Sequence, residues 1–388
     1  MVPRRRVIVI HGYPATEANA VEMARALAHR YTGRIVWLDG PERAYLSAID
    51  IPVERIEVVG RNTIRGILSY VVAEVTFFTH GLYGTPPAVG RKPTVNLWHG
   101  EAIKNFDPLL PDRHARGRPY DYHVGATRLL GQRSVQVAGT PPPQLLLTGY
   151  PRIAALRRDC TDGQLEALGI DVSRPFVIWM PTFRQTKSVS SSPGFQDTLN
   201  PSVDLELARL FSNWVSLLVG SGIQVVVKPH PLDSSARDAQ GAVLLDDHLL
   251  TAAGVQLYSV LGRADGLITD FSSVATDFLH LDRPVAYFFP DLESYLGGRG
   301  VYPHDALEHL AGPQLHDEPS VRAFIDDVLS AGEASREKRA AARDWFGLVS
   351  AESSAERLLD ELDARIPSLR TLVSRRDPQA PAGLEGPT

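Results

Sequence analysis

The sequence predicts an α/β protein made of two similar halves, each built around a parallel sheet. Short β-branched runs alternate with amphipathic helical patterns along most of the chain, which indicates βαβ units. This alternation restarts after residues 149–152, and a chain of 388 residues is too long for one ordinary hydrophobic core. We therefore expect two α/β domains, at 1–150 and 151–345, followed by a C-terminal helix at 346–366.

The first half contains the longer series of expected strands. They are placed at residues 7–10, 34–38, 55–59, 75–79, 94–98, 122–126 and 145–148. A helix is expected after the first strand, capped by Thr16 and carrying an apolar stripe up to Tyr31. The apolar segment 66–83 contains Glu74 and His80, so we predict a helix end followed by a strand there rather than a membrane span.

The second half repeats the pattern with fewer strands. They are expected at residues 176–180, 223–227, 267–269 and 284–289. A long helix with its cap at Asp204 is expected between the first two strands, and Gly220 ends it. The tail at 367–388, rich in Arg, Pro and Gly, is expected to be disordered.

Composition excludes several classes of protein. The net charge of −5 argues against nucleic acid as the main partner, because nucleic-acid-binding domains carry a basic excess. The one cysteine, Cys160, cannot form an intrachain disulfide, which favours a reducing compartment. The apolar run at the start is too short for a signal peptide. The sequence has no zinc-ligand spacing, no Walker loop and no GxGxxG after the first strand.

One strand of the first half ends in polar residues suited to chemistry. Ligands of doubly wound sheets bind beyond the carboxyl ends of the strands. His99 follows the strand at 94–98 and can take a proton near neutral pH, while Gly100 lets a ligand approach the backbone. Glu101 and Lys104 come next. The alternative is a strand-end histidine bonded to a neighbouring loop, and that structural interpretation is preferred for His11 and His80, which also follow strands.

The strand ends of the second half share groups that bind anions. Hydroxyls, guanidinium groups and a helix N-terminus all suit phosphate oxygens. Pro229 and Pro231 stiffen the turn around His230 and hold this histidine in a single orientation. The candidates are Thr182 and Arg184, then Lys228 and His230, then Asp270, Ser272 and Ser273, and finally Arg299. The alternatives are basic surface loops and simple capping of helices.

The order of these motifs is more specific than any one of them. It resembles the CDP-glycerol glycerophosphotransferase family, which builds teichoic acids and related polyol-phosphate polymers. The matching stretches are NLWHG at 96–100 with Lys104, TGYPR at 148–152, MPTFR at 180–184, KPHP at 228–231, ADGLITDFSS at 264–273, TDF at 276–278, DRP at 282–284 and RG at 299–300. Members of the family usually carry Thr at the position of Glu101, so the contact to the acceptor or polyol is where this chain departs.

The resemblance implies a GT-B fold, in which two Rossmann-like domains face each other across a cleft. It implies a CDP-glycerol or CDP-ribitol donor bound mainly by the second domain. It also implies an acceptor linked to undecaprenyl diphosphate, reached at the cytoplasmic face of the membrane. The expected reaction transfers a polyol phosphate, glycerol phosphate first and ribitol phosphate as the alternative, and releases CMP. No cofactor is required, and Mg²⁺ bridging the diphosphate is compatible with the family.

The resemblance also implies a role for each candidate residue. His99 is expected to be the general base, and His230 to hold or protonate the pyrophosphate. Gly100, Glu101 and Lys104 are assigned to the acceptor or polyol side. The donor phosphates are assigned to Thr182, Arg184, Ser272, Ser273 and Arg299, with Lys228 in support, and Asp270 orients a histidine or contacts the nucleotide.

A peripheral position on the inner face of the membrane is expected, because the acceptor is lipid-linked. The stretch 104–118 mixes apolar and basic residues, which suits an anionic membrane surface, and an ordinary solvated loop is the alternative. Two other functions are compatible with the same fold. One is a glycosyltransferase or epimerase that uses a UDP-sugar, and the other is a non-catalytic binding subunit.

Overall fold

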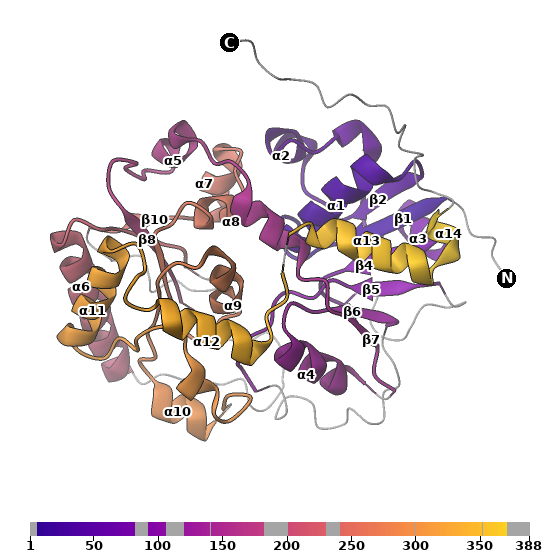
Figure 1. The fold of residues 1–388 in the computed structure, drawn as a ribbon. Coiled ribbons are helices and arrows are strands. Elements are labelled where there is room, and N and C mark those ends of the chain that lie inside the picture. Colours follow the sequence, from indigo (N-terminus) through magenta and orange to yellow (C-terminus); the bar gives the residue numbers. More distant parts are fainter. Residues whose placement is uncertain are drawn as a thin grey trace, which may run out of the picture.

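The computed structural model describes residues 6–81, 92–105, 120–139, 141–181, 201–229, 241–298, 300–350 and 352–370. They form two α/β domains that lie side by side (Figure 1). Each domain is a parallel sheet covered by helices, as the alternation of patterns predicts.

The first domain contains a seven-stranded sheet in the order β3-β2-β1-β4-β5-β6-β7, with every paired strand parallel. The order reverses direction between β1 and β4, which is the switch point of a Rossmann-type sheet. The strands are β1 (Val7–His11), β2 (Arg34–Leu38), β3 (Ile56–Val59), β4 (Val75–Phe78), β5 (Thr94–Asn96), β6 (Tyr122–Val124) and β7 (Gln144–Leu146).

Helices cover both faces of this sheet. They are α1 (Ala18–Arg30), α2 (Arg43–Ala48), the 3-10 helix η1 (Val53–Arg55), α3 (Ile64–Val72) and α4 (Arg128–Ala138). The prediction that Thr16 caps the first helix was wrong. The cap is Glu17, whose longer side chain reaches back to accept a hydrogen bond from the Ala20 amide at 2.9 Å.

The second domain contains a five-stranded parallel sheet in the order β10-β9-β8-β11-β12. Its strands are β8 (Phe176–Met180), β9 (Gln224–Val227), β10 (Val243–Leu244), β11 (Gly266–Thr269) and β12 (Val285–Tyr287). The two-residue strand β10 was not predicted. The helices are α5 (Asp162–Ala167), α6 (Pro201–Gly220), α7 (Asp247–Ala252), α8 (Leu257–Leu261), α9 (Val274–Phe278), α10 (Leu292–Gly297), α11 (Glu318–Leu329) and α12 (Arg336–Phe346), with 3-10 helices η6 (Leu279–Leu281) and η7 (Ala306–His309). Helix α6 begins at Pro201, before the predicted cap Asp204.

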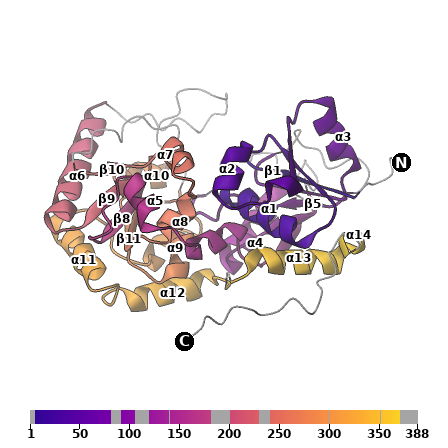
Figure 2. The same cartoon turned by 90° about the horizontal axis from the view of Figure 1, so that it is seen from above.

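The chain passes between the domains twice. The 3-10 helix η4 (Pro151–Arg157) leads out of the first sheet and packs against α1, α8 and α13. After α12 the chain returns, and α13 (Ser354–Arg365) lies along the first domain, followed by α14 (Pro367–Arg370) (Figures 1 and 2). Asp363 fixes α13 there, because it accepts hydrogen bonds from the Tyr31 hydroxyl and the Arg30 guanidinium at 2.7 Å each.

The C-terminal part of the chain differs from the prediction in two details. The helix expected at 346–366 starts only at Ser354, because Gly347 ends α12 with a left-handed backbone (φ 62°). Part of the tail expected to be disordered forms α14, and residues 371–388 lie outside the described residues. Within the described part of the chain, no helix combines the length and apolarity needed to cross a membrane.

Candidate active site between the two domains

The carboxyl ends of the two sheets meet at the domain interface. The loop after β5 carries Trp98, His99 and Gly100, and the segment after β11 carries Ser272 and Ser273. Gly100 has φ 124°, and a Cβ at this position would lie 2.2 Å from the Ser273 hydroxyl oxygen. Only glycine fits this backbone and this close approach. The structure therefore brings together two motifs that the sequence separates widely.

A cavity of about 350 Å³ opens between the domains beside this contact. His99 and Arg152 line it, and so do residues of both domains. The first domain contributes Tyr13, Pro14, Thr16, Glu17, Ala18, Tyr45 and His80, and the second contributes Asp247, Leu250, Thr251, Val255, Gln256, Leu257 and Tyr258. A cleft between two domains, walled by apolar and polar groups together, is a common place for a small-molecule site.

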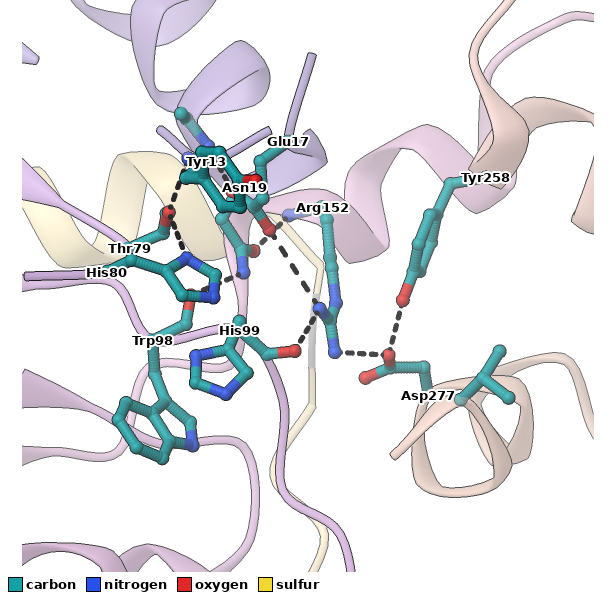
Figure 3. A network of polar contacts seen from close by, with 12 residues as sticks. Tyr13, Glu17, Asn19, Thr79, His80, Trp98, His99, Arg152, Tyr258 and Asp277 are labelled. Atoms are coloured by element: carbon teal, nitrogen blue, oxygen red, sulfur yellow. Dashed lines mark hydrogen bonds and ion pairs between the residues drawn. The ribbon is translucent and has the colours of Figure 1, made fainter. Parts of the chain in front are cut away.

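His99 lies at the wall of this cavity. Its ring stacks on His80 with 4.4 Å between centroids and packs against Trp98 at 4.3 Å (Figure 3). Although part of the ring faces solvent, the surrounding protein lowers the pKa of His99, and the charges of His80 and Arg152 lower it further. The imidazole is therefore neutral at neutral pH, the form that can accept a proton.

Arg152 holds the loop that carries His99 (Figure 3). Its side chain is 5% exposed and donates to the His99 carbonyl at 2.9 Å and to the Asp277 carboxylate at 2.5 Å. Tyr258 donates to the same carboxylate oxygen at 2.6 Å. A buried ion pair thus joins the loop of the first domain to α9 of the second. The sequence motifs include Arg152 and Asp277, but nothing in them predicts that the two residues pair.

Asn19 provides a second support for the same loop. Its side-chain amide donates to the Trp98 carbonyl at 3.2 Å, and its carbonyl oxygen accepts from the Arg152 backbone N–H at 3.1 Å. Glu17 lies 4.0 Å from the Arg152 guanidinium, and burial raises the pKa of its carboxyl to about 7. Neither residue was predicted for the site from the sequence, because an asparagine and a glutamate at a helix start carry no distinctive pattern.

Four of the donor-side residues proposed from sequence can be placed in the second domain. Lys228 is 7% exposed and lies 3.1 Å from Asp247, which lines the cavity. Asp270 is buried at the end of β11, and Ser272 and Ser273 follow it at the start of α9. The other four, Thr182, Arg184, His230 and Arg299, lie outside the described residues.

Glu101 points into the first domain. It is 2% exposed, and its two carboxylate oxygens accept hydrogen bonds from the Ala126 and Thr127 amides at 3.1 and 2.7 Å. Burial raises the pKa of the carboxyl to about 7. Ala126 also contacts the segment that returns from the second domain, because its carbonyl accepts a hydrogen bond from the Val349 amide at 2.9 Å. A contact of Glu101 with acceptor or polyol stays a prediction.

A second cavity, of about 290 Å³, shares no lining residue with the first. It contains all three positions assigned to the acceptor side, Gly100, Glu101 and Lys104. Its other walls are Trp98, Ala102, Tyr120, Leu130, Arg133, Ser134, Val137, Ala138 and Tyr302. Since His99 lines one cavity while its chain neighbours line the other, this loop separates the two.

No three His, Cys, Asp or Glu side chains gather as a potential metal site among the residues described here. Whether the chain needs Mg²⁺ therefore stays a prediction.

The sequence matches the family model of CDP-glycerol:poly(glycerophosphate) glycerophosphotransferase over residues 5–363. The chain belongs to this family. The family expected from the order of the motifs is thereby confirmed, and the match includes both halves of the molecule and the helix α13 that returns to the first domain.

Curated relatives of this family member come from teichoic acid synthesis. A ribitol-phosphate primase of Bacillus spizizenii is 33% identical over 125 residues, 32% of this chain and 31% of the relative. A glycerol-phosphate transferase of Staphylococcus aureus is 27% identical over 66% of this chain and 65% of the relative. A poly(glycerol phosphate) polymerase of Bacillus subtilis is 23% identical over 71% of this chain and 38% of the relative. The chain thus spans about a third to two thirds of these relatives.

Solved structures agree on the fold. The wall teichoic acid polymerase TagF superposes with a TM-score of 0.70 at 19% identity, over 94% of this chain and 90% of that chain. A UDP-N-acetylglucosamine 2-epimerase superposes with a TM-score of 0.52 at 13% identity, over 98% of this chain and 100% of that chain. Both proteins have the two-domain GT-B architecture, so the predicted fold class is confirmed.

Proposed function

We propose that this chain transfers a polyol phosphate from a CDP-activated donor to a hydroxyl of a lipid-linked acceptor and releases CMP. Glycerol phosphate is the expected unit and ribitol phosphate the alternative. The observation that carries the proposal is the position of the His99 imidazole at the wall of an interdomain cavity, on a loop that both domains hold. The relatives support it, because they are named for glycerol-phosphate and ribitol-phosphate transfer, and a TagF variant was soaked with CDPG.

The donor is assigned to the second-domain side of the cleft. Parallel strands bind ligands at their carboxyl ends, and β8, β9 and β11 end at the same edge of their sheet. The Lys228 ammonium and the Ser272 and Ser273 hydroxyls supply a charge and donors suited to a diphosphate. Thr182, Arg184, His230 and Arg299 complete the proposed donor site in the segments that follow β8, β9 and α10.

The chemical step is an in-line substitution at phosphorus. The acceptor oxygen attacks the phosphorus that bears the polyol and forms a new P–O bond, while the bond to the bridging oxygen breaks and CMP leaves with the electron pair. His99 takes the hydroxyl proton, and His230 holds or protonates the leaving phosphate. Positioning and charge stabilisation account for most of the rate enhancement in such transfers. Arg152 fixes the backbone of His99 and so positions the base.

The reacting hydroxyl of the acceptor is assigned to the first cavity, beside His99, and the more distant part of the acceptor to the second cavity, which Gly100, Glu101 and Lys104 help to line. Trp98 and Tyr302 contribute apolar walls, and the Lys104 ammonium and the Arg133 guanidinium, which lies over the Tyr302 ring, offer positive charge for phosphate. An acceptor of this kind is carried by undecaprenyl diphosphate, so the proposed working position is peripheral, on the cytoplasmic face of an anionic membrane. Most of the stretch 104–118 proposed for this contact lies outside the described residues.

A donor screen tests the proposal. CDP-glycerol, CDP-ribitol and UDP-sugars are each incubated with a lipid-linked disaccharide mimic, with and without EDTA, and nucleotide release and product mass are measured. Release of CMP with a mass increase of one polyol phosphate is expected. UDP release from a UDP-sugar without CMP release would favour a sugar enzyme of the same fold. Binding of donors without turnover would favour a non-catalytic subunit.

A further inference from the structure

Helix α3 exposes an apolar stripe on the surface of the first domain. The four residues are spaced i, i+3, i+4 and i+7, which places them on one face of the helix. Their side chains are far from buried: Ile64 is 79% exposed, Ile67 45%, Leu68 56% and Val71 43%. Single exposed apolar residues are common, but a continuous stripe of this kind marks an interaction surface.

The rest of the helix is firmly anchored, so the exposure is not caused by a loose end. Gly66 and Ser69 are buried, and Tyr70 and Val72 pack against a cluster from the sheet formed by Val7, Val9, Val36, Leu38, Val59 and Ala73. Thr63 caps the helix, accepting a hydrogen bond from the Gly66 amide at 3.0 Å. The sheet therefore presents the stripe outward on a rigid support.

The charges beside the stripe are compatible with a lipid headgroup layer. Arg65 is exposed and pairs with Glu57 at 2.6 Å, and Arg61 pairs with Asp39 at 3.3 Å. Glu57 also accepts from Arg34 at 2.7 Å. Each of these carboxylates therefore has a cationic partner, so they add no net negative charge that would repel anionic lipids.

We propose that the α3 stripe docks this protein on the surface of a lipid bilayer. A helix of 9 residues is about 13 Å long. Four side chains of so short a helix cover far less than the roughly 800 Å² that each partner of a stable protein dimer buries. A bilayer surface needs no such area, because a few apolar side chains inserted at the acyl boundary are enough for reversible binding.

The position of α3 in the molecule fits this partner. In Figure 2 the helix lies at the end of the first domain away from the second domain, so docking there leaves the second domain clear of the lipid surface. The benefit of docking rests on the proposed function, because only a lipid-linked acceptor requires the protein to work at a bilayer. The docking itself is measured without any reaction.

Vesicle flotation tests the docking. The variant Ile64→Ser/Leu68→Ser is compared with Val172→Ser/Leu329→Ser, a control that replaces two exposed apolar residues of the second domain. With vesicles of phosphatidylcholine and phosphatidylglycerol, the α3 variant is expected to partition roughly tenfold more weakly than the unchanged protein. The control is expected to bind as the unchanged protein does. Circular dichroism and gel filtration establish that all three are folded and in the same oligomeric state.

Three results would overturn the proposal. They are no vesicle binding by the unchanged protein, full binding by the α3 variant, or an unchanged dimer that the α3 substitutions convert to a monomer. The last would assign the stripe to a second copy. CMP release with a water-soluble acceptor mimic is measured in parallel and is expected to be equal in the three proteins. Failure of that reaction in the unchanged protein would count against the proposed function and leave the flotation result standing.

A fluorescent probe gives an independent measurement. The chain has a single cysteine, Cys160, which is 2% exposed and shielded from labelling in the folded protein. Ile67→Cys labelled with an environment-sensitive dye is expected to show a blue shift when vesicles are added. Leu329→Cys, labelled in the same way, is expected to show none. Equal spectra of labelled Ile67→Cys with and without vesicles would contradict insertion of this face.

Discussion

The two domains bring different chemistry to the cleft although their sheets follow the same kind of strand order. In the first domain, histidines gather at the carboxyl ends of neighbouring strands, and burial lowers the pKa of each: His11, His80, His99 and His123. In the second domain, the corresponding edge carries Lys228, Asp270 and two serines. Among the described residues, the first edge thus carries neutral imidazoles and the second a cation and hydrogen-bond donors, while His230, assigned to the second edge from the sequence, lies outside them.

The difference suits the proposed transfer reaction, because its two roles need different surroundings. A base needs an environment that keeps it unprotonated, whereas an anion needs positive charge and donors. The two requirements are met by residues of different domains, which meet at the interface. The contact between the edges, where Arg152 meets Asp277, is therefore the part of the site on which the division depends.

The largest expected effect comes from breaking that contact. Asp277→Asn leaves the Arg152 guanidinium without its charged partner at a site where both side chains are almost fully buried. Removal of one partner of a buried pair costs about 3–5 kcal/mol. Urea denaturation followed by fluorescence should show a loss of this size. The exposed pair Arg157–Glu352 offers the matched control, and Glu352→Gln should change stability by less than about 1 kcal/mol. Equal effects of the two substitutions would contradict a central role for the buried pair.

The second effect concerns the base. His99→Ala should lower kcat for CMP release by roughly 100-fold or more, because general base catalysis contributes on that order. His80→Ala removes the stacked neighbour and should have a smaller effect on kcat. In the unchanged enzyme, the acid limb of the pH profile should lie below the usual histidine range, since the pKa of His99 is lowered. Near-normal turnover in folded His99→Ala would rule out the base assignment.

The effect that is smallest at neutral pH, and grows only as the pH falls, is a pH dependence of stability due to a buried histidine. Burial lowers the pKa of His123 to about 3, so the folded protein keeps this ring neutral while the unfolded chain protonates it below about pH 6.5. The free energy of unfolding should therefore fall as pH drops from 6.5 towards 3, by at most about 1.4 kcal/mol per pH unit for this group. His123→Asn keeps a polar partner for Tyr120 and should make the slope shallower. An unchanged slope in urea titrations across this range would contradict the assignment.

Local patterns predicted the sheets well because strands of a doubly wound fold are short, buried and β-branched. The runs at 34–38 and 176–180 coincide with β2 and β8 to the residue. The path of α13 was not predictable in this way, because its place depends on Asp363 meeting Tyr31 from 332 positions away. The cap Glu17 was missed because glutamate is a rare cap.

The sequence predicted several residues of the site, but not the hydrogen bonds and ion pairs that join them. His99 and Gly100 follow a strand, so sequence alone could place them at the cleft. The motifs also named Lys228, which follows strand β9, but its partner Asp247 lies on helix α7, and no local pattern links them. Pairings between distant segments follow from the packing of whole domains. Sequence periodicity describes one element at a time and therefore cannot supply them.

The double passage of the chain between the domains limits how the cleft can open. The chain enters the second domain through η4 and leaves it between Phe346 and Ser354, where Thr127 and Leu348 form a β-bridge to the first domain. Two domains joined by the chain at two points can rotate relative to each other mainly about the line through those points, in a hinge motion. An opening of the cleft is therefore expected to be a rotation about one axis, which would fix the direction from which the proposed donor enters.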